Sequence, residues 1–187
     1  MIASFKGKKY ELKGKKCVLG GISKNSLPQF VKWMTDSKVN RYLSRDYSGQ
    51  TLKDEKKWYS HAKNGKDEVV FGIYALDNGK KRLIGSVTLM KIDFTHKNSE
   101  FGIIIGDKNY WGKGIGSEVT KLIADFGFKV LKLNSVYLTV DMENKGGQKA
   151  YKRAGFKKAG VLREHVKRKK GFSETFIMDL IRKDWKK

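Results

Sequence analysis

The spacing of hydrophobic residues along the chain predicts both helices and strands. Between residues 115 and 130 apolar side chains recur every three or four positions, as on one face of a helix, at Ile115, Val119, Leu122, Ile123, Phe126 and Val130. Residues 135–140 alternate instead, and one face of that predicted strand is formed by Val136, Leu138 and Val140. We therefore predict a helix over 114–130, preceded by a strand at 99–105.

Capping and turn signals divide the rest of the chain. Ser26-Leu27-Pro28-Gln29 has the form of a capping box and predicts a helix that ends near Asp36. Thr51 to Asp54 starts a second predicted helix, and Asn64-Gly65 ends it. Further strands are predicted at 16–19, 69–76, 82–91, 161–167 and 173–181, with a short helix at 149–154. Asp77-Asn78-Gly79-Lys80 and a Lys-Gly turn at 168–171 would close two antiparallel hairpins.

The element order β-α-α-β-β-β-α-β-α-β-β predicts a single α/β domain over residues 1–187. Strands that alternate with crossover helices imply a mixed, partly parallel sheet. No internal repeat, low-complexity tract or linker interrupts the sequence.

The glycine-rich turn before the predicted helix indicates a phosphate site. Glycines let backbone amides approach a ligand, and the free amides and dipole of a first helical turn favour negative charge. The spacing does not match a Walker loop, and Ser117 or Val119 stands where a dinucleotide fingerprint needs its third glycine. A plain tight turn is the alternative interpretation.

The chain from His96 to Trp185 resembles the GCN5-related N-acetyltransferase (GNAT) superfamily, in particular its spermidine-acetyltransferase-like and ribosomal-protein-acetyltransferase-like branch. The matching motifs stand in the family's order, at Ser99–Ile105, Tyr110–Gly116, Val136–Val140, Asn144 with Tyr151 seven residues on, and Ala154-Gly155-Phe156. The resemblance implies the GNAT fold with splayed central parallel strands. It also implies acetyl-CoA as the acetyl donor.

The family resemblance further implies how that donor would bind. Its pyrophosphate would rest on the loop and the helix start, at Trp111, Gly112, Lys113, Gly114, Ile115, Gly116 and Ser117. Its pantetheine arm would bond to the strand backbone at Ile103, Ile104 and Ile105, with Asn144 close to that arm or simply capping the next helix. Trp111 replaces the family's usual Arg or Gln, so only its backbone is expected to contact phosphate. Gly102 and Gly106 are candidate bulge positions that would open the strands.

Transfer to an amine needs a base, an oxyanion donor and an acid. The resemblance implies Tyr151 as the general acid, although a core aromatic is the alternative role. Glu100 is the predicted base, acting through a water, although a surface glutamate at a strand end is the alternative role. His96 is the alternative base, and a backbone amide near Ile104 would serve the oxyanion. Asp141 and Glu143 could bind a cationic amine. No Ser-His-Asp or Cys-His arrangement is visible in the sequence, which favours direct transfer over an acyl-enzyme.

The formal charge of +22, from 41 Lys and Arg against 19 Asp and Glu, fits two interpretations. Such an excess indicates either a nucleic-acid or ribosome partner or a solubilising surface. The lysines are scattered, which favours the surface interpretation. No apolar run approaches the ~20 residues of a membrane helix, and the start of the chain lacks a signal-peptide pattern. The one cysteine and three histidines show no metal-ligand spacing, so we expect a cytoplasmic protein without a metal.

Together these features predict an N-acetyltransferase whose acceptor is a primary amine. In the segment 36–61, where an acceptor pocket is expected, Lys and Arg outnumber the acids Asp36, Asp46, Asp54 and Glu55. We therefore favour a protein N-terminus, an amino sugar or another small metabolite over the polycation spermidine. The alternatives are a spermidine acetyltransferase and a catalytically idle GNAT-fold protein that binds RNA or ribosomes. The oligomeric state stays open, a homodimer included.

Overall fold

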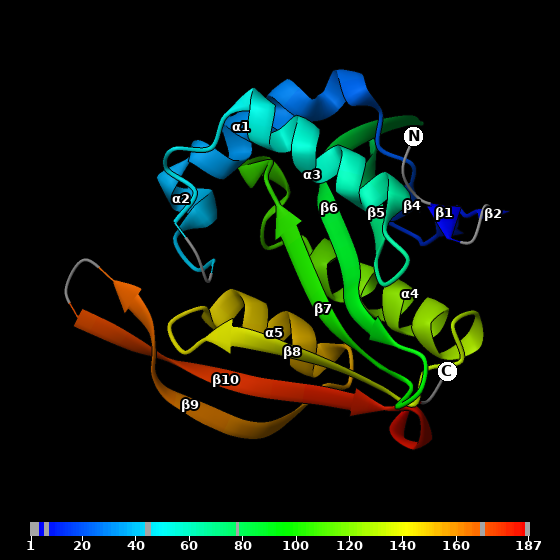
Figure 1. Cartoon of the computed structure of the whole chain (residues 1–187), viewed down its shortest axis with the longest axis vertical. Helices are drawn as coiled ribbons and strands as arrows, with labels where there is room; N and C mark the ends of the chain where they lie inside the picture. The colour runs from blue at the N-terminus through cyan, green and yellow to red at the C-terminus, as the bar shows by residue number, and fades with distance from the viewer. Residues whose placement is uncertain (1–3, 6–7, 44–45, 78, 169–170, 186–187) are drawn as a thin grey trace.

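The structure is a computed structural model that describes residues 4–5, 8–43, 46–77, 79–168 and 171–185. In the described chain one mixed sheet has the strand order β3-β4-β5-β6-β7-β8-β10-β9, and β1 and β2 form a separate ladder (Figure 1). The strand bounds are β1 Ser4–Phe5, β2 Lys8–Lys9, β3 Leu12–Lys13, β4 Cys17–Gly20, β5 Val69–Asp77, β6 Lys80–Asp93, β7 Asn98–Ile105, β8 Ser135–Asp141, β9 Lys157–Arg168 and β10 Gly171–Ile181.

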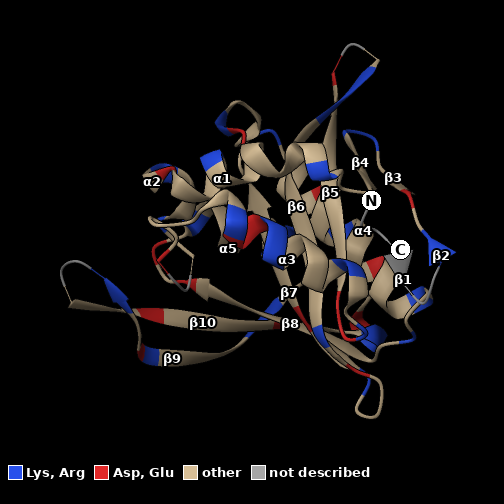
Figure 2. Cartoon of the chain, turned by 45° about the horizontal axis from the view of Figure 1, so that its top comes forward, with Lys and Arg blue, Asp and Glu red and all other residues tan. Residues whose placement is uncertain are grey.

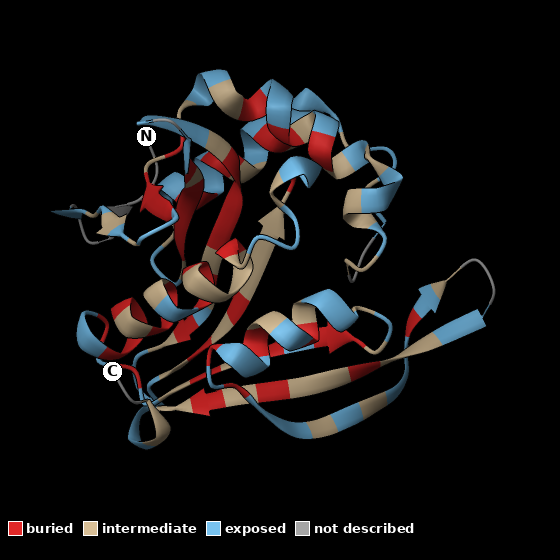
Figure 3. Cartoon of the chain, turned by 180° about the vertical axis from the view of Figure 1, so that it is seen from behind, coloured by how far each residue is buried: buried red, intermediate tan, exposed pale blue. Residues whose placement is uncertain are grey.

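Helices cover both faces of this sheet. Their bounds are α1 Leu27–Thr35, α2 Ser37–Asn40, α3 Leu52–Asn64, α4 Ile115–Lys129 and α5 Lys145–Arg153, with short 3-10 turns at Lys24–Ser26, Lys108–Tyr110 and Arg182–Asp184. Seen from behind, α4 and α5 lie side by side in front of the sheet (Figure 3). The predicted α/β fold is confirmed, and its elements follow one another in the predicted order. The structure adds the short strands β1, β2 and β3 and the short helix α2.

Two hydrophobic clusters hold the layers together. The larger one packs α4 against the central strands, with Ile115, Val119 and Ile123 buried beside Phe71 and Leu89. The smaller one packs α1 and α3 on the opposite face, through residues that include Phe30, Trp33, Tyr59 and Val70. Alternate residues of β5 enter different clusters, as the two-residue period of a strand requires.

The parallel strands β7 and β8 share one end and diverge toward the other (Figure 1). They pair only at Asn98–Ser135, Ser99–Val136 and Glu100–Tyr137, although β7 continues to Ile105 and β8 to Asp141. The splay implied by the family resemblance is therefore present.

Of the two glycines expected to cause this splay, Gly106 lies in a bulge and Gly102 does not. The backbone amides of Gly106 and Asp107, directly after β7, both donate to the Ile84 carbonyl, so two residues oppose one as in a β-bulge. Pairing of β6 with β7 is unbroken from Gly85–Ile105 to Met90–Glu100, and its irregularity comes later, before Asp93–Asn98. Packing also requires a glycine at position 106, where a ring lies against the backbone, whereas the contact at Gly102 is with the movable end of a methionine side chain. A Cβ on Gly102 would lie 2.8 Å from the Met90 Cε, and one on Gly106 would lie 2.1 Å from the Trp33 ring.

Three local predictions differ from the structure. Ser26 makes no side-chain cap, because a 3-10 turn already precedes α1 and Ser23 accepts the bond from the Asn25 amide. Val130 ends the stripe of α4 but is 41% exposed, since the helix stops at Lys129. Helix α5 begins at Lys145, four residues before the predicted start, because Asn144 caps a first turn that contains two glycines. The capping box of Thr51 and Asp54 on α3 is confirmed.

Candidate active site

The loop between β7 and α4 leaves the helix N-terminus open to a ligand. Gly112 and Gly114 have φ angles of 74° and 81°, in the left-handed region that glycine tolerates best. Gly114 is the N-cap of α4, and no side chain bonds to the first-turn amides as a cap. Ile115 is buried, so its side chain belongs to the core and only its amide can serve a ligand. The predicted anion site has the required backbone geometry.

A basic turn from a distant part of the sequence is fixed to this loop. The Glu118 carboxylate, in the first turn of α4, accepts hydrogen bonds from the backbone amides of Lys15 (2.6 Å) and Lys16 (2.9 Å). The Lys16 ammonium in turn donates to the Lys113 carbonyl at 2.8 Å. The sequence pattern does not predict these lysines, because about a hundred residues separate them from the loop. Their charge adds to the positive field of the helix N-terminus.

Trp111 uses its side chain inside the protein. Its indole Nε1 donates to the Ile105 carbonyl at 2.7 Å, while 44% of the residue is exposed. The bond holds the loop back onto the end of β7. Among the residues predicted to bind pyrophosphate, Trp111 can therefore offer its backbone and an exposed ring edge rather than a charged group.

The free edge of β7 presents alternate backbone groups to the gap between the strands. The Gly106 amide donates to the Ile84 carbonyl on β6, and hydrogen bonding alternates along an antiparallel ladder, so the Ile104 amide also faces β6. The amides of Ile103 and Ile105 then face the side of β8, beyond the point where pairing ends. The backbone amide that donates to the oxyanion would therefore be that of Ile103 or Ile105. Ile103 lies nearer the point where the two strands diverge.

Tyr151 lies on α5 beneath the start of this gap. Its ring meets that of Phe101 edge to face, with centroids 5.7 Å apart. The residue is 9% exposed, and burial raises the pKa of its hydroxyl to about 12. No hydrogen bond to this hydroxyl is found among the described residues. Asn144, seven residues earlier, caps α5 through its Oδ1, which accepts from the Gly147 amide at 2.9 Å.

Glu100 lies on the opposite face of β7 from Tyr151. Side chains alternate along a strand, so Phe101 points toward α5 while Glu100 points toward the side of α1 and α3. The Glu100 carboxylate is 2.8 Å from the Lys91 ammonium, and this hydrogen bond raises the pKa of Lys91. The predicted acid and base therefore approach the diverging strands from opposite faces.

His96 is placed less favourably than Glu100. It lies in the turn between β6 and β7, where its Nδ1 is 2.9 Å from Asp93 Oδ2. This turn precedes the paired end of β7, and the gap lies beyond the other end of that pairing. The alternative base is therefore separated from the gap by the paired segment.

Asp141 is held by the protein rather than open to an amine. Its side chain is 3% exposed and accepts hydrogen bonds from Arg168 (2.5 Å), Ser173 (2.9 Å) and the Glu143 amide (2.8 Å). Burial opposes ionisation, but these donors outweigh it and hold the pKa of Asp141 below its usual range. The Arg168 guanidinium also donates to the Leu43 carbonyl at 3.2 Å, which joins the β9–β10 hairpin to the segment after α2. The expectation that Asp141 binds a cationic substrate is not supported by this arrangement.

The acids of the expected acceptor segment are also engaged within the chain. Asp36 pairs with Lys108, and Asp54 closes the cap of α3. Glu55 is 2% exposed and accepts from the side-chain amide of Gln50 at 3.2 Å, while Asp46 accepts from the Ser48 backbone amide at 2.8 Å. This segment therefore offers a polycation little free negative charge.

Positive charge is spread over the molecule, on elements as distant as α1, β2 and β9 (Figure 2). Within the described ranges, no group of three or more His, Cys, Asp and Glu is arranged to hold a metal ion. The described helices also include none with the length and apolar character needed to cross a membrane. Cys17 is buried, and burial next to Glu118 raises its thiol pKa to about 12, which argues against a thiolate nucleophile at this position.

A comparison of the sequence with known protein families agrees with the splayed strands and the open helix N-terminus. Residues 18–157 match the family described as the acetyltransferase (GNAT) domain. The chain belongs to the GNAT family. Its fold is also that of GNAT structures: the spermidine N-acetyltransferase of Vibrio cholerae, solved with CoA and spermine, superposes with a TM-score of 0.83 at 22% identity, over 91% of this chain and 98% of that one.

Curated relatives within the GNAT family match part of their length. The spermidine N(1)-acetyltransferase of Escherichia coli K12 is 42% identical over 78 residues, which is 42% of this chain and 41% of the relative. The probable N-acetyltransferase YjcK of Bacillus subtilis is 36% identical over 101 residues, 54% of this chain and 55% of the relative. The chain thus spans about half the length of the curated relatives that it matches.

Proposed function

We propose that this GNAT protein transfers the acetyl group of acetyl-CoA directly to a primary amine. The observation that carries the proposal is the succession of two features along one stretch of chain. The edge of β7 is free of β8 beyond Glu100, and the first turn of α4, without a side-chain cap, begins after Gly114. An extended, amide-bearing arm that ends in phosphates matches a strand edge without a partner followed by an open helix N-terminus.

The residues of this chain fit the donor through their backbone. The amides of Ile103 and Ile105 both face the gap. The Ile105 amide can bond to the pantetheine arm, which leaves the Ile103 amide for the acetyl group. The loop from Gly112 to Ser117 can hold the pyrophosphate on its amides, because Gly112 has open space at its Cβ position and Gly114 carries no capping side chain. Trp111 and Lys113 would contribute backbone groups, and Asn144 would keep α5 in place beside the arm.

Transfer to an ammonium removes two protons from the acceptor nitrogen, one before the attack and one as the amide forms, and supplies one proton to the departing sulfur. The Glu100 carboxylate would take the proton of the acceptor ammonium through a water, so that the amine nitrogen can attack the acetyl carbonyl carbon. The Ile103 amide would donate to the oxyanion on that carbon. As the carbon–sulfur bond breaks, the Tyr151 hydroxyl would give its proton to the departing thiolate. The acceptor nitrogen would lose its second proton as the amide forms, and that proton would return through water to the Tyr151 phenolate. Its raised pKa keeps that hydroxyl protonated at neutral pH.

For the acceptor we favour an amine with less charge than a polyamine, such as a peptide N-terminus, an amino sugar or a small metabolite. The support is electrostatic: the acids of the 36–61 segment and Asp141 all have partners within the chain, and the net charge is +22. Spermidine is the second candidate, and the names of the Escherichia coli and Vibrio cholerae relatives favour it.

A panel of acceptors tests this proposal. The consumption of acetyl-CoA would be measured with spermidine, glucosamine and short peptides with free N-termini, using Tyr151→Phe as the low-activity control. We expect turnover with the peptides or the amino sugar. Turnover with spermidine alone would replace the favoured acceptor by the second candidate. A protein that binds RNA in a salt-dependent titration and consumes no acetyl-CoA with any amine would instead be the idle binder.

A further inference from the structure

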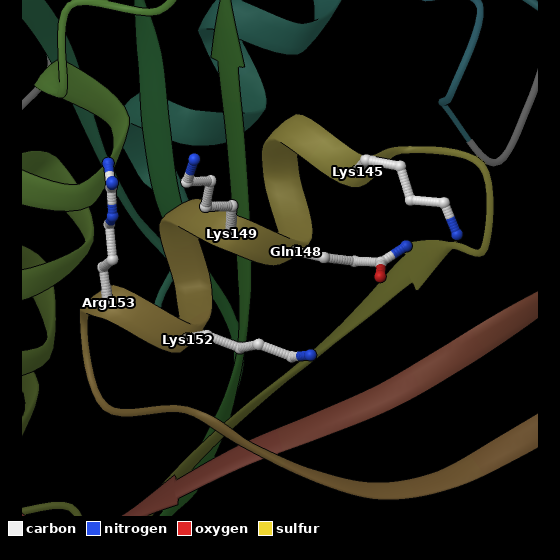
Figure 4. A pocket seen from close by; sticks show the side chains of 5 residues that line it. All are labelled: Lys145, Gln148, Lys149, Lys152 and Arg153. Carbon is white, nitrogen blue, oxygen red and sulfur yellow. The ribbon is translucent and has the colours of Figure 1, made fainter.

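Helix α5 carries a group of cations without acidic partners. Lys145, Lys149, Lys152 and Arg153 line a shallow hollow of about 430 Å³ together with Gln148 (Figure 4). Lys149 and Arg153 extend from one side of the helix, whereas the other three side chains extend in a different direction (Figure 4). Among the described residues, none of the four cations forms an ion pair. Such a surface favours the binding of an anion.

Without a bound anion, these cations destabilise α5. Lys145 and Lys149 are four residues apart, as are Lys149 and Arg153, and like charges at that spacing repel one another. Lys145 also occupies the first turn, where the helix dipole disfavours a cation. The first turn contains no acid that would offset this effect. A bound anion would relieve both sources of repulsion.

The cations lie beside the loop proposed to hold pyrophosphate. A Cβ on Gly116, in the first turn of α4, would lie 3.7 Å from the Ala150 Cβ and 3.7 Å from the Ile105 Cδ1. Ala150 of α5 and the Ile105 side chain at the free end of β7 therefore both lie beside the first turn of α4. Lys149 is its neighbour in sequence, and Arg153, three residues later, shares its side of the helix.

A second basic hollow, on the other side of the loop, is a weaker candidate for an anion site. It has a volume of about 570 Å³ and includes Lys16, Arg82 and Lys113 in its lining. There the Lys16 ammonium already donates to the Lys113 carbonyl, and the Arg82 guanidinium is 3.4 Å from Asp107. The lining also contains the acid Asp77. These charges are partly neutralised within the protein, unlike those of α5.

We propose that Lys149 and Arg153 bind the 3′-phosphate on the ribose of coenzyme A. This inference rests on the proposed function, since it assumes that the coenzyme's pyrophosphate lies on the first turn of α4. A phosphate monoester carries a charge of about −1.5 to −2 at neutral pH, and it accepts charge-assisted hydrogen bonds from both side chains. The two residues would select the phosphorylated coenzyme over its 3′-dephospho form.

Calorimetric titration with CoA and with 3′-dephospho-CoA tests the assignment. We expect the unmodified protein to bind CoA at least about tenfold more tightly, the effect of a charge-assisted contact. In the double variant Lys149→Gln with Arg153→Gln, the affinity for CoA should fall to that for the dephospho form, while the latter changes little. The variant Lys63→Gln with Lys66→Gln removes the same charge from exposed positions at the end of α3 and should keep the discrimination.

Each other outcome has a defined meaning. Equal affinity of the unmodified protein for both ligands would overturn the 3′-phosphate assignment while leaving coenzyme binding intact. An equal loss of affinity for both ligands in the double variant would also overturn it, because α5 would then act through general charge or folding. Failure of the unmodified protein to bind either ligand would contradict the proposed function itself.

Discussion

The indole of Trp33 lies directly over the backbone of Gly106. A Cβ at position 106 would be 2.1 Å from the Trp33 ring, which is 7% exposed and packed among the residues of α1 and α3. Gly106 follows β7 and precedes the loop at the start of α4. Helix α1, on one face of the sheet, thereby fixes the end of the strand from which the proposed phosphate loop departs.

This contact predicts a specific cost for a small substitution. Gly106→Ala should lower the free energy of unfolding by about 1–3 kcal/mol, because a well-packed ring must move to admit one methyl group. Denaturant unfolding measures the change. In a Trp33→Leu background the same substitution should cost clearly less, since the ring is absent. An equal cost in both backgrounds would show that the ring contact is not the cause.

The phosphate loop can be predicted from the sequence because its signals are local. The apolar strand, the glycines and the helical stripe follow one another within a single short stretch of chain, and each has a short-range physical cause. The bonds from Lys15 and Lys16 to Glu118 join segments about a hundred residues apart, and the Arg168–Asp141 pair depends on the packing of a hairpin. Only the folded sheet brings those residues together.

The same limit explains why the predicted bulge is found at Gly106 but not at Gly102. A glycine within a strand has the same local pattern whether it forms a bulge or admits a neighbouring side chain. Met90 lies on the neighbouring strand β6, and Trp33 lies on α1, which precedes β7 by many residues. The choice between the two roles therefore rests on tertiary contacts that the local pattern does not contain.

Substitution of Gly114 tests the coenzyme site. Gly114→Val places a β-branched side chain at a φ of 81°, next to the first-turn amides, so we expect the affinity for CoA to fall steeply. Gly171→Val is the matched control, since Gly171 has a φ of 109° and open space around it in the β9–β10 hairpin. Both variants should lose stability, but calorimetry should find CoA binding weakened only in the first. Unchanged affinity in Gly114→Val would remove the loop from the site.

Removal of the Tyr151 hydroxyl tests the proposed acid. Tyr151→Phe keeps the ring against Phe101 and should reduce turnover by ~10²–10⁴-fold, while the affinity for CoA changes little. Tyr59→Phe is the control, because it deletes another buried hydroxyl, which bonds to the Ile22 carbonyl within the smaller cluster around α1 and α3. Near-normal turnover of Tyr151→Phe would leave the ring a structural role only.

The Asp141–Arg168 pair predicts how stability depends on acid. The folded-state pKa of Asp141 is lowered, so the stability from its carboxylate is fully present above the unfolded value of ~3.9 and is lost as the pH falls through the folded value. Asp141→Asn should be less stable at pH 7, because Arg168 loses its charged partner. The free energy of unfolding of the Asp141→Asn variant should also fall less than that of the unmodified protein as the pH is lowered from about 5 to about 2.

Denaturant unfolding over this pH range measures both effects. Glu11→Gln is the control, since Glu11 forms an exposed pair with Lys81 at 2.7 Å that water and salt screen. It should change stability little at any pH. If Asp141→Asn lost stability in acid as steeply as the unmodified protein, other carboxylates would govern the acid response. The Arg168 contact would then position the hairpin against Leu43 without contributing to the acid response.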